Sequence, residues 1–130
     1  MQNDSIDDEE ILYRAVPNLS DYWKESAGVF TSAIFSDSKG VSVDRDGGRS
    51  EAEIIEAFNK RYSAESGLVA ITGRQCREAG AHPIPKPTTD NPYHAEIHQS
   101  AERVQLSGSR KKALRDHCRI IRLPAIARNK

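Results

Sequence analysis

Short strand-like runs and short helix-like runs are mixed along this chain without the regular β-α-β alternation of a doubly wound fold. The predicted strands cover residues 11–16, 29–35, 41–43, 67–71, 94–98 and 118–123. With 130 residues and 37% hydrophobic content, the chain supports one domain with a small core. We therefore predict an α+β fold, in which two or three short helices pack on a small, mostly antiparallel sheet.

The best-marked helix follows a Gly-Gly turn signal near the middle of the chain. Ser50 is a natural N-cap, and Glu53 stands three residues later as its capping-box partner. Thr72 can cap a second, brief helix that a glycine closes. The predicted helices cover residues 51–62, 73–78 and 109–117.

Two connecting segments carry strong local signals. The turn sequence SDSKG separates the strands predicted at 29–35 and 41–43, which favours a hairpin between them. The segment HPIPKPTTDNP at 82–92 contains four prolines, and each proline fixes φ and lacks a backbone donor. This segment is predicted to be a stiff, extended surface loop without regular structure.

The ends of the chain are predicted to lie outside the domain at 11–123. Residues 1–10 carry five acids and no base, so we expect them to be disordered or to cap the basic end loosely. Residues 124–130 are predicted to be a basic tail. No stretch approaches the ~20 apolar residues of a membrane span, and two cysteines are too few for a disulfide framework. We therefore predict a cytoplasmic protein that makes no membrane contact.

Charge is distributed unevenly, although the formal net charge is zero. Residues 103–130 contain nine Lys or Arg and one acid, a balance of +8, which leaves −8 for residues 1–102. This balance predicts contact with a protein partner or with nucleic acid through the basic segment, and the alternative is a solvated charged face. The predicted nucleic-acid contacts are Arg110, Lys111, Lys112, Arg115, Arg119 and Arg122. Positions 111, 115, 119 and 122 would form one stripe if the helix continued past residue 117.

The tripeptide His-Ala-Glu at 94–96 matches half of the zinc deaminase signature, but the required P-C-x-x-C is missing downstream. On a strand, His94, Glu96 and His98 would share one face and Ala95 and Ile97 the other. Two imidazoles and a carboxylate suit a transition metal, or acid/base catalysis by His94 and Glu96. An ordinary half-buried strand shows the same alternation, with its polar residues merely solvated.

An early arginine, Arg14, is the second candidate, considered with Thr31, Ser32 and Tyr93. An arginine on an early strand followed by a Ser/Thr-rich strand resembles ADP-ribosyltransferase-like folds, which implies a grip on dinucleotide phosphates. The planar guanidinium suits phosphate because it donates two bonds at once. The alternative is an ion pair with one of the many acids of the first 102 residues.

Five blocks carry a wider resemblance: LYRAVP, FTSAIF, GVSVDRD, ITGRQCREAG and DNPYHAEI. They are similar to recurring blocks of small bacterial proteins of uncharacterised function, which share an early arginine, a Ser-Ala-Phe strand, a Leu-Ser-Val-like strand and an Asn-Pro-x-His-Ala segment. The likeness spans residues 12–97 and implies one compact domain but no activity. The basic segment lies outside it.

Two functional classes follow. The first is an interaction module that binds a protein or nucleic acid through the basic segment. The alternative is a small enzyme that acts on a nucleotide or nucleic-acid phosphate, either ADP-ribosyltransferase-like or with a His/Glu metal site. The first is favoured, and no cofactor is predicted, because the sequence contains no Gly-rich phosphate loop and no nucleophile with a neighbouring base.

Overall fold

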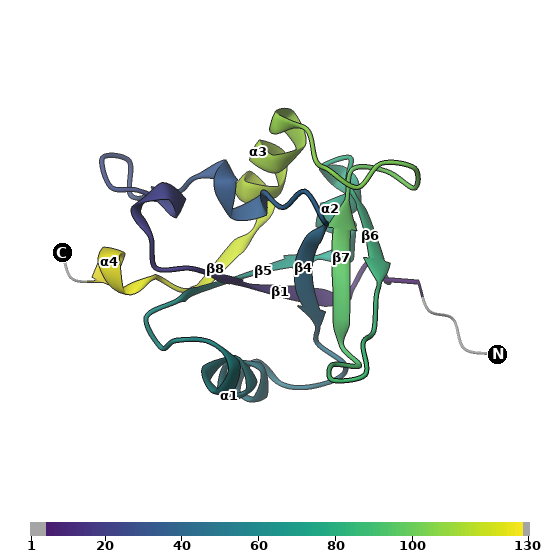
Figure 1. The fold of residues 1–130 in the computed structure, drawn as a ribbon, viewed down its shortest axis with the longest axis horizontal. Helices are drawn as coiled ribbons and strands as arrows, with labels where there is room; N and C mark the ends of the chain where they lie inside the picture. Colours follow the sequence, from purple (N-terminus) through teal and green to yellow (C-terminus); the bar gives the residue numbers. More distant parts are fainter. Residues whose placement is uncertain (1–4, 129–130) are drawn as a thin grey trace.

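A six-stranded sheet in the order β6-β7-β4-β1-β5-β8 forms the centre of the protein, and every neighbouring pair in it is antiparallel. The computed structural model describes residues 5–128 (Figure 1). The main sheet comprises β1 (Ile11–Val16), β4 (Val41–Arg45), β5 (Gly67–Thr72), β6 (His82–Pro85), β7 (His94–His98) and β8 (Arg119–Arg122). A separate hairpin joins β2 (Trp23–Lys24) to β3 (Val29–Phe30). The predicted α+β class with a mostly antiparallel sheet is confirmed.

Helices cover both faces of the main sheet. They are α1 (Glu51–Arg61), α2 (Gly73–Glu78), α3 (Gly108–His117) and α4 (Ala125–Arg128), with 3-10 turns η1 (Ser20–Tyr22) and η2 (Ser32–Phe35). Figure 1 shows α1 below the sheet and α3 above it. None of the helices in residues 5–128 is long and apolar enough to cross a membrane.

The core is divided between the two faces because strand side chains alternate. Leu12 of β1 belongs to the larger cluster, which α2, α3 and η2 complete with Cys76, Leu114 and Phe35. The next residue, Tyr13, belongs to the smaller cluster under α1. The two clusters therefore sit back to back across β1.

The predicted capping box at Ser50 forms, and the predicted cap at Thr72 is also a capping box, with Gln75 as its partner. The Ser50 side chain accepts a hydrogen bond from the Glu53 backbone while Glu53 reaches back to the Ser50 backbone, and Thr72 and Gln75 do the same at α2. Each box satisfies two backbone donors that have no partner within the helix. The predicted helix at 51–62 is thus confirmed to within one residue of its end.

The strand predicted at 29–35 and its hairpin with 41–43 are wrong. Within 29–35 only Val29–Phe30 forms a strand, and it pairs with β2, whereas β4 pairs with β1 and β7. Ile34 and Phe35 are both buried although they are consecutive. A strand would send them to opposite faces, so the 3-10 turn is the local structure that buries both.

The proline segment is more regular than predicted, because His82–Pro85 forms β6 at the edge of the sheet. Pro83 lies opposite Ile97, and Pro85 lies opposite Ala95. An edge strand needs ladder bonds on one side only, so missing proline donors are tolerated there. Residues 86–93 remain without helix or strand, as predicted.

Both ends of the described chain differ from the expectation of loose tails. Ile6 is 2% exposed, Asp8 lies 2.8 Å from Arg77, and Glu10 lies 2.7 Å from Arg45. At the other end, the Ala125 backbone donates to Glu65 at 2.8 Å. Apolar burial and ion pairs with arginines that lie outside the basic segment thus order residues 5–10, and the expectations for residues 1–4 and 129–130 lie outside the described residues.

Candidate functional site

The strands β1 and β4 diverge after two residue pairs, which opens a crevice in the sheet. They pair only at Leu12 with Arg45 and at Tyr13 with Asp44, while β1 continues to pair with β5 along its whole length. A cavity of about 260 Å³ lies in this opening. The polar residues that line this β1–β4 crevice are Arg14, Ser42, Asp44, Arg61, Tyr62 and His94.

Arg14 spans the point where the two strands separate. Its Nε donates to the Ile34 carbonyl at 2.6 Å, and its Nη1 donates to the Ser42 carbonyl at 2.8 Å. These bonds tie β1 to η2 and to β4 where the ladder has stopped. Burial lowers the pKa of Arg14, yet a guanidinium that normally titrates above about 12 stays protonated at neutral pH.

The second terminal nitrogen of Arg14, Nη2, makes no hydrogen bond within residues 5–128, and no carboxylate of that range forms an ion pair with the guanidinium. No side-chain nitrogen or oxygen of the described chain is both fully buried and without a hydrogen bond. Nη2 must therefore reach solvent, and Arg14 lines the crevice. This side chain supplies a positive charge that Asp37 attracts without forming an ion pair, and a donor that no described residue uses.

Among residues 5–128, Asp44 is the only acidic residue that lines the crevice, and its charge is already neutralised. It is 4% exposed, and its Oδ2 lies 2.8 Å from Arg61 Nη1. Its Oδ1 accepts a hydrogen bond from Asn91 Nδ2 at 3.0 Å. With this pair balanced, the net charge of the crevice is that of Arg14.

His94 lies directly opposite Asp44 across the β4–β7 pair, and Tyr13 lies opposite Asp44 on the other side. His94 Nδ1 is 2.8 Å from the Lys86 carbonyl, which can only accept, so Nδ1 carries the proton. In the neutral ring, Nε2 then keeps its lone pair. His94 can accept a proton at Nε2, or donate one when it is charged.

The predicted metal triad does not assemble. Ala95 and Ile97 are fully buried, which confirms the predicted alternation. His98 Nε2 contacts Glu96 Oε1 at 2.8 Å, whereas the His94 ring turns to the Lys86 carbonyl. Within residues 5–128 no three His, Cys, Asp or Glu side chains are placed to hold a metal ion. Each histidine thus has its own local hydrogen-bond partner.

The other residues grouped with Arg14 lie in different contacts. Thr31 Oγ1 donates to the Asp21 carbonyl at 2.8 Å. The Tyr93 ring lies under the Arg49 guanidinium, 3.7 Å from ring centroid to carbon. Neither residue lines the crevice, so the grouping of Thr31, Ser32 and Tyr93 around Arg14 is not observed. In place of the predicted strand at 29–35, Thr31 is the extended N-cap of η2 and Ser32 is the first residue of that 3-10 turn.

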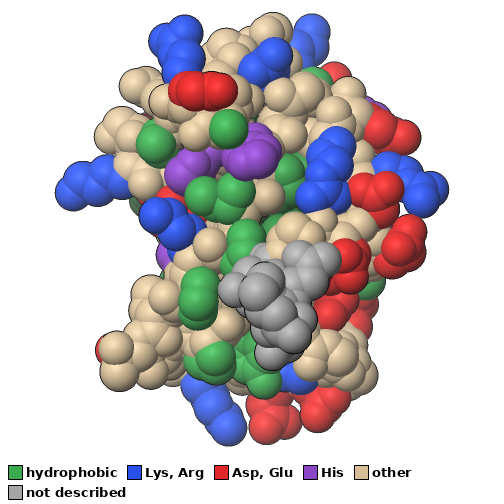
Figure 2. Space-filling model, turned by 90° about the vertical axis from the view of Figure 1, so that its right-hand side faces the viewer, with side chains coloured by type: hydrophobic (Ala, Val, Ile, Leu, Met, Phe, Trp, Pro, Cys, Tyr) green, Lys and Arg blue, Asp and Glu red, His purple; other side chains and the backbone are tan. Residues whose placement is uncertain are grey.

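The condition for one basic stripe over positions 111 to 122 is not met, because α3 ends at His117, as predicted, and Cys118 caps it. Arg119 then extends to Glu51 at 3.0 Å, and Arg122 extends to Asn59 at 2.7 Å. Arg110 donates to the Gln99 carbonyl at 3.0 Å. Figure 2 shows one face of the molecule, on which basic and acidic side chains lie side by side.

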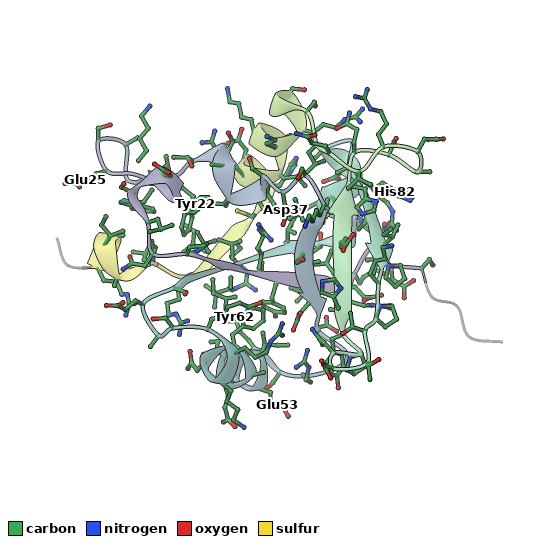
Figure 3. The ribbon with its side chains drawn as sticks, in the orientation of Figure 1. Tyr22, Glu25, Asp37, Glu53, Tyr62 and His82 are labelled. Carbon is green, nitrogen blue, oxygen red and sulfur yellow. The ribbon has the colours of Figure 1, made fainter. Side chains whose placement is uncertain are left out.

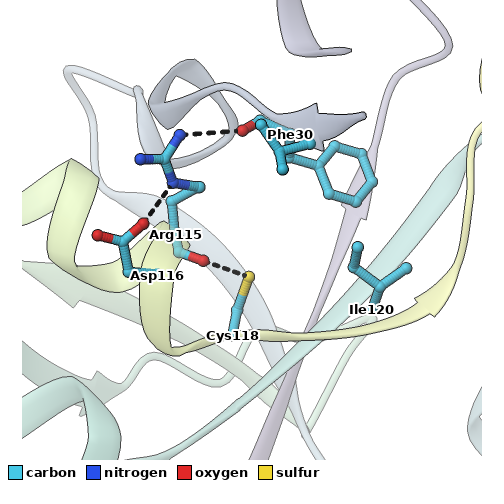
Figure 4. Close-up of a pocket in the computed structure, with 6 residues that line it drawn as sticks. Phe30, Arg115, Asp116, Cys118 and Ile120 are labelled. Carbon is cyan, nitrogen blue, oxygen red and sulfur yellow. Dashed lines mark hydrogen bonds and ion pairs between the residues drawn. The ribbon is translucent and has the colours of Figure 1, made fainter. Parts of the chain in front are cut away.

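Arg115 lines a second cavity, of about 300 Å³ (Figure 4). It donates to the Phe30 carbonyl at 3.1 Å and lies 2.7 Å from Asp116. The Cys118 thiol donates to the Arg115 carbonyl, and burial raises the pKa of Cys118 to about 11. Of the six predicted nucleic-acid contacts, Lys111 and Lys112 alone make no side-chain hydrogen bond or ion pair within the described residues.

Four of the polar residues that line the crevice were not among the predicted site residues: Ser42, Asp44, Arg61 and Tyr62. Asp44 follows a predicted strand, and Arg61 and Tyr62 end the predicted helix, but no sequence spacing links these positions. The antiparallel β4–β7 register brings Asp44 and His94 together across 50 residues of chain. A search of protein-family models, of curated proteins and of solved structures finds no match to this chain.

Proposed function

We propose that the β1–β4 crevice binds a small phosphorylated ligand, and that Arg14 anchors its phosphate. The observation that carries this proposal is the partly buried guanidinium of Arg14, which has a free Nη2 and no carboxylate partner within residues 5–128. A charge withdrawn from water is unfavourable unless an opposite charge compensates it. A ligand anion would supply that compensation, and a phosphate suits the planar donor group.

The size of the cavity limits the ligand. Small-molecule sites usually enclose about 300–1,000 Å³, and the crevice encloses about 260 Å³. This volume suits a phosphate ester no larger than a mononucleotide and is too small to enclose a dinucleotide. It therefore favours a compact phosphate ester over the dinucleotide that an ADP-ribosyltransferase-like reading would require.

His94 would supply acid/base chemistry beside the bound phosphate. Its Nδ1 is held by the Lys86 carbonyl, which leaves Nε2 as the acceptor. A neutral His94 can accept a proton from a ligand hydroxyl, and a charged His94 can add a second cation to the site. In this proposal Arg14 binds the ligand and His94 moves a proton.

Calorimetric titration of the full chain with ribose 5-phosphate tests this proposal. The variants are Arg14→Gln and Arg61→Gln, and the matched control is Arg103→Gln, which removes an exposed arginine outside the crevice. We expect the wild type and the control to bind alike, and Arg14→Gln to lose roughly tenfold in affinity, the equivalent of one charged hydrogen bond. Equal binding by all four chains would contradict the proposal.

A second candidate is weak polyanion binding through α3. Its support is that Lys111 and Lys112 are adjacent and make no side-chain bond within the described residues. Two phosphate contacts would give a salt slope near −2 in a logarithmic plot of binding to duplex DNA. The variant K111E/K112E should abolish binding, whereas binding that ignores salt or survives this variant would contradict it. A cytoplasmic setting fits both candidates.

A further inference from the structure

The wall of the crevice at the end of α1 is aromatic. Tyr62 stacks on Phe58 with ring centroids 5.4 Å apart and an angle of 23° between the planes. Both rings line the cavity that Arg14 also lines. Figure 3 shows Tyr62 in the space between β1 and α1. One crevice therefore combines an anion anchor with a flat apolar surface.

The Tyr62 ring is held in place and is still accessible. Its backbone N–H donates to the Phe58 carbonyl at 2.8 Å, and its hydroxyl accepts from Arg61 Nη2 at 3.3 Å. Phe58 covers one side of the ring, yet Tyr62 remains 40% exposed. A fixed and partly exposed ring can serve as a stacking platform where Phe58 and Arg61 do not cover it, because little rotamer freedom is lost when a second ring packs on it.

Arg61 connects the two ends of the crevice. Its guanidinium carbon lies 5.2 Å from the centre of the Tyr62 ring and 5.8 Å from that of Phe58. Its Nη1 donates a hydrogen bond to Asp44, so the same side chain contacts both the acidic residue of the crevice and its aromatic wall. A ligand that fits this arrangement has an anion at one end and a flat ring at the other.

We infer that the phosphorylated ligand is a nucleoside monophosphate, whose phosphate binds Arg14 and whose base stacks on Tyr62. This inference rests on the proposed function and names the class of ligand for the same site. Every nucleobase presents an aromatic face, so stacking tolerates different bases. The cavity volume of about 260 Å³ favours one nucleotide rather than a chain of them.

Calorimetry with three probes separates the two ends of the ligand. Adenosine 5′-monophosphate carries both groups, ribose 5-phosphate lacks the base, and adenosine lacks the phosphate. With the wild-type chain, we expect the monophosphate to bind roughly tenfold more tightly than ribose 5-phosphate, because one base stacks on an aromatic ring. Adenosine should bind more weakly than the monophosphate.

Two variants of the platform complete the test. Tyr62→Leu should bring the affinity for the monophosphate down to that for ribose 5-phosphate without changing the latter. Tyr62→Phe keeps the ring and should retain the preference for the monophosphate. Thermal melting of each variant checks that it is folded, which is expected because Tyr62 is partly exposed.

The outcomes distinguish the inference from the proposal beneath it. Equal affinity of the wild type for the monophosphate and for ribose 5-phosphate would overturn the nucleotide inference and leave the phosphate site standing. Retention of the preference by Tyr62→Leu would overturn it as well. Binding of neither phosphorylated probe would overturn the phosphate site itself, and the inference with it.

Discussion

The guanidinium of Arg14 donates to the Ser42 carbonyl at 2.8 Å across the gap where β1 and β4 cease to pair. The same group donates to the Ile34 carbonyl at 2.6 Å. One side chain thus replaces missing ladder bonds and leaves a donor, Nη2, on the crevice side. The structural bonds of Arg14 thus use Nε and Nη1, and the proposed ligand contact would use Nη2.

Replacement of Arg14 by methionine should destabilise the fold. Two carbonyls would lose a charged donor, and such hydrogen bonds contribute about 1.5–3 kcal/mol each, so a loss of about 3–6 kcal/mol in the free energy of unfolding is expected. Arg14→Lys can satisfy one carbonyl and should lose about half as much. Urea unfolding measures both, and a loss below about 0.5 kcal/mol for Arg14→Met would show that these bonds do not hold β4.

Replacement of Asp44 by asparagine should change stability and ligand affinity in opposite directions. Asp44 is 4% exposed and pairs with Arg61, so its removal leaves that cation without compensation and should destabilise the fold by about 1–3 kcal/mol. The crevice gains one net positive charge, so ribose 5-phosphate should bind more tightly. Urea unfolding and calorimetry on the same preparation measure the two effects. Weaker phosphate binding by a folded Asp44→Asn variant would contradict the charge balance described for the crevice.

The Glu10–Arg45 ion pair should make the free energy of unfolding depend on pH in the acidic range. The hydrogen bond from Arg45 lowers the pKa of Glu10 below its usual 4.5. A depressed carboxylate contributes stability that is fully present above the unfolded pKa and is lost as pH falls through the folded pKa. Glu10→Gln should therefore reduce stability by about 1 kcal/mol at pH 7 and by progressively less below about pH 4. Urea unfolding from pH 7 to pH 2.5 measures the difference, and a gap independent of pH would argue against the ion pair.

The two thiols should react slowly in the folded protein. Burial raises the pKa of Cys76 to about 12 and that of Cys118 to about 11, so little thiolate is present at pH 8. Because Cys76 is fully buried and Cys118 only partly, Cys118 should react first with a thiol-specific disulfide reagent. Cys76→Ser and Cys118→Ser assign the two phases. Reaction of both thiols at the rate measured in urea would contradict this burial.

Alanine substitutions at Gly40 and Gly48 can be compared to measure how tightly Glu96 is packed. Both have positive φ, +111° and +78°, so alanine is strained at each. A Cβ at Gly40 would come within 3.0 Å of the Glu96 carboxylate, whereas a Cβ at Gly48 meets nothing within 4 Å. Gly40→Ala should therefore destabilise the fold by about 1–2 kcal/mol more than Gly48→Ala. Equal losses in thermal or urea unfolding would show that Glu96 and His98 move aside freely.

Local chemistry in the sequence determined several parts of this protein by itself. The capping box at Ser50 and Glu53 and the alternation of residues 94–98 could be predicted, because both depend on neighbours within a few residues. The α+β class followed from the order of such segments. Arg14 and His94 could be named as candidate residues from their chemistry, but neither their shared cavity nor the role of Arg61 could.

Tertiary structure alone decided the rest. The burial of Ile34 and Phe35 together turned a strand-like sequence into a 3-10 turn, and an edge position allowed a strand that contains two prolines. The crevice exists because β1 follows β5 for six residue pairs and β4 for only two. Pairing between strands that are distant in sequence depends on how the faces of the sheet pack against the helices, and it cannot be predicted from the spacing of residues along the chain.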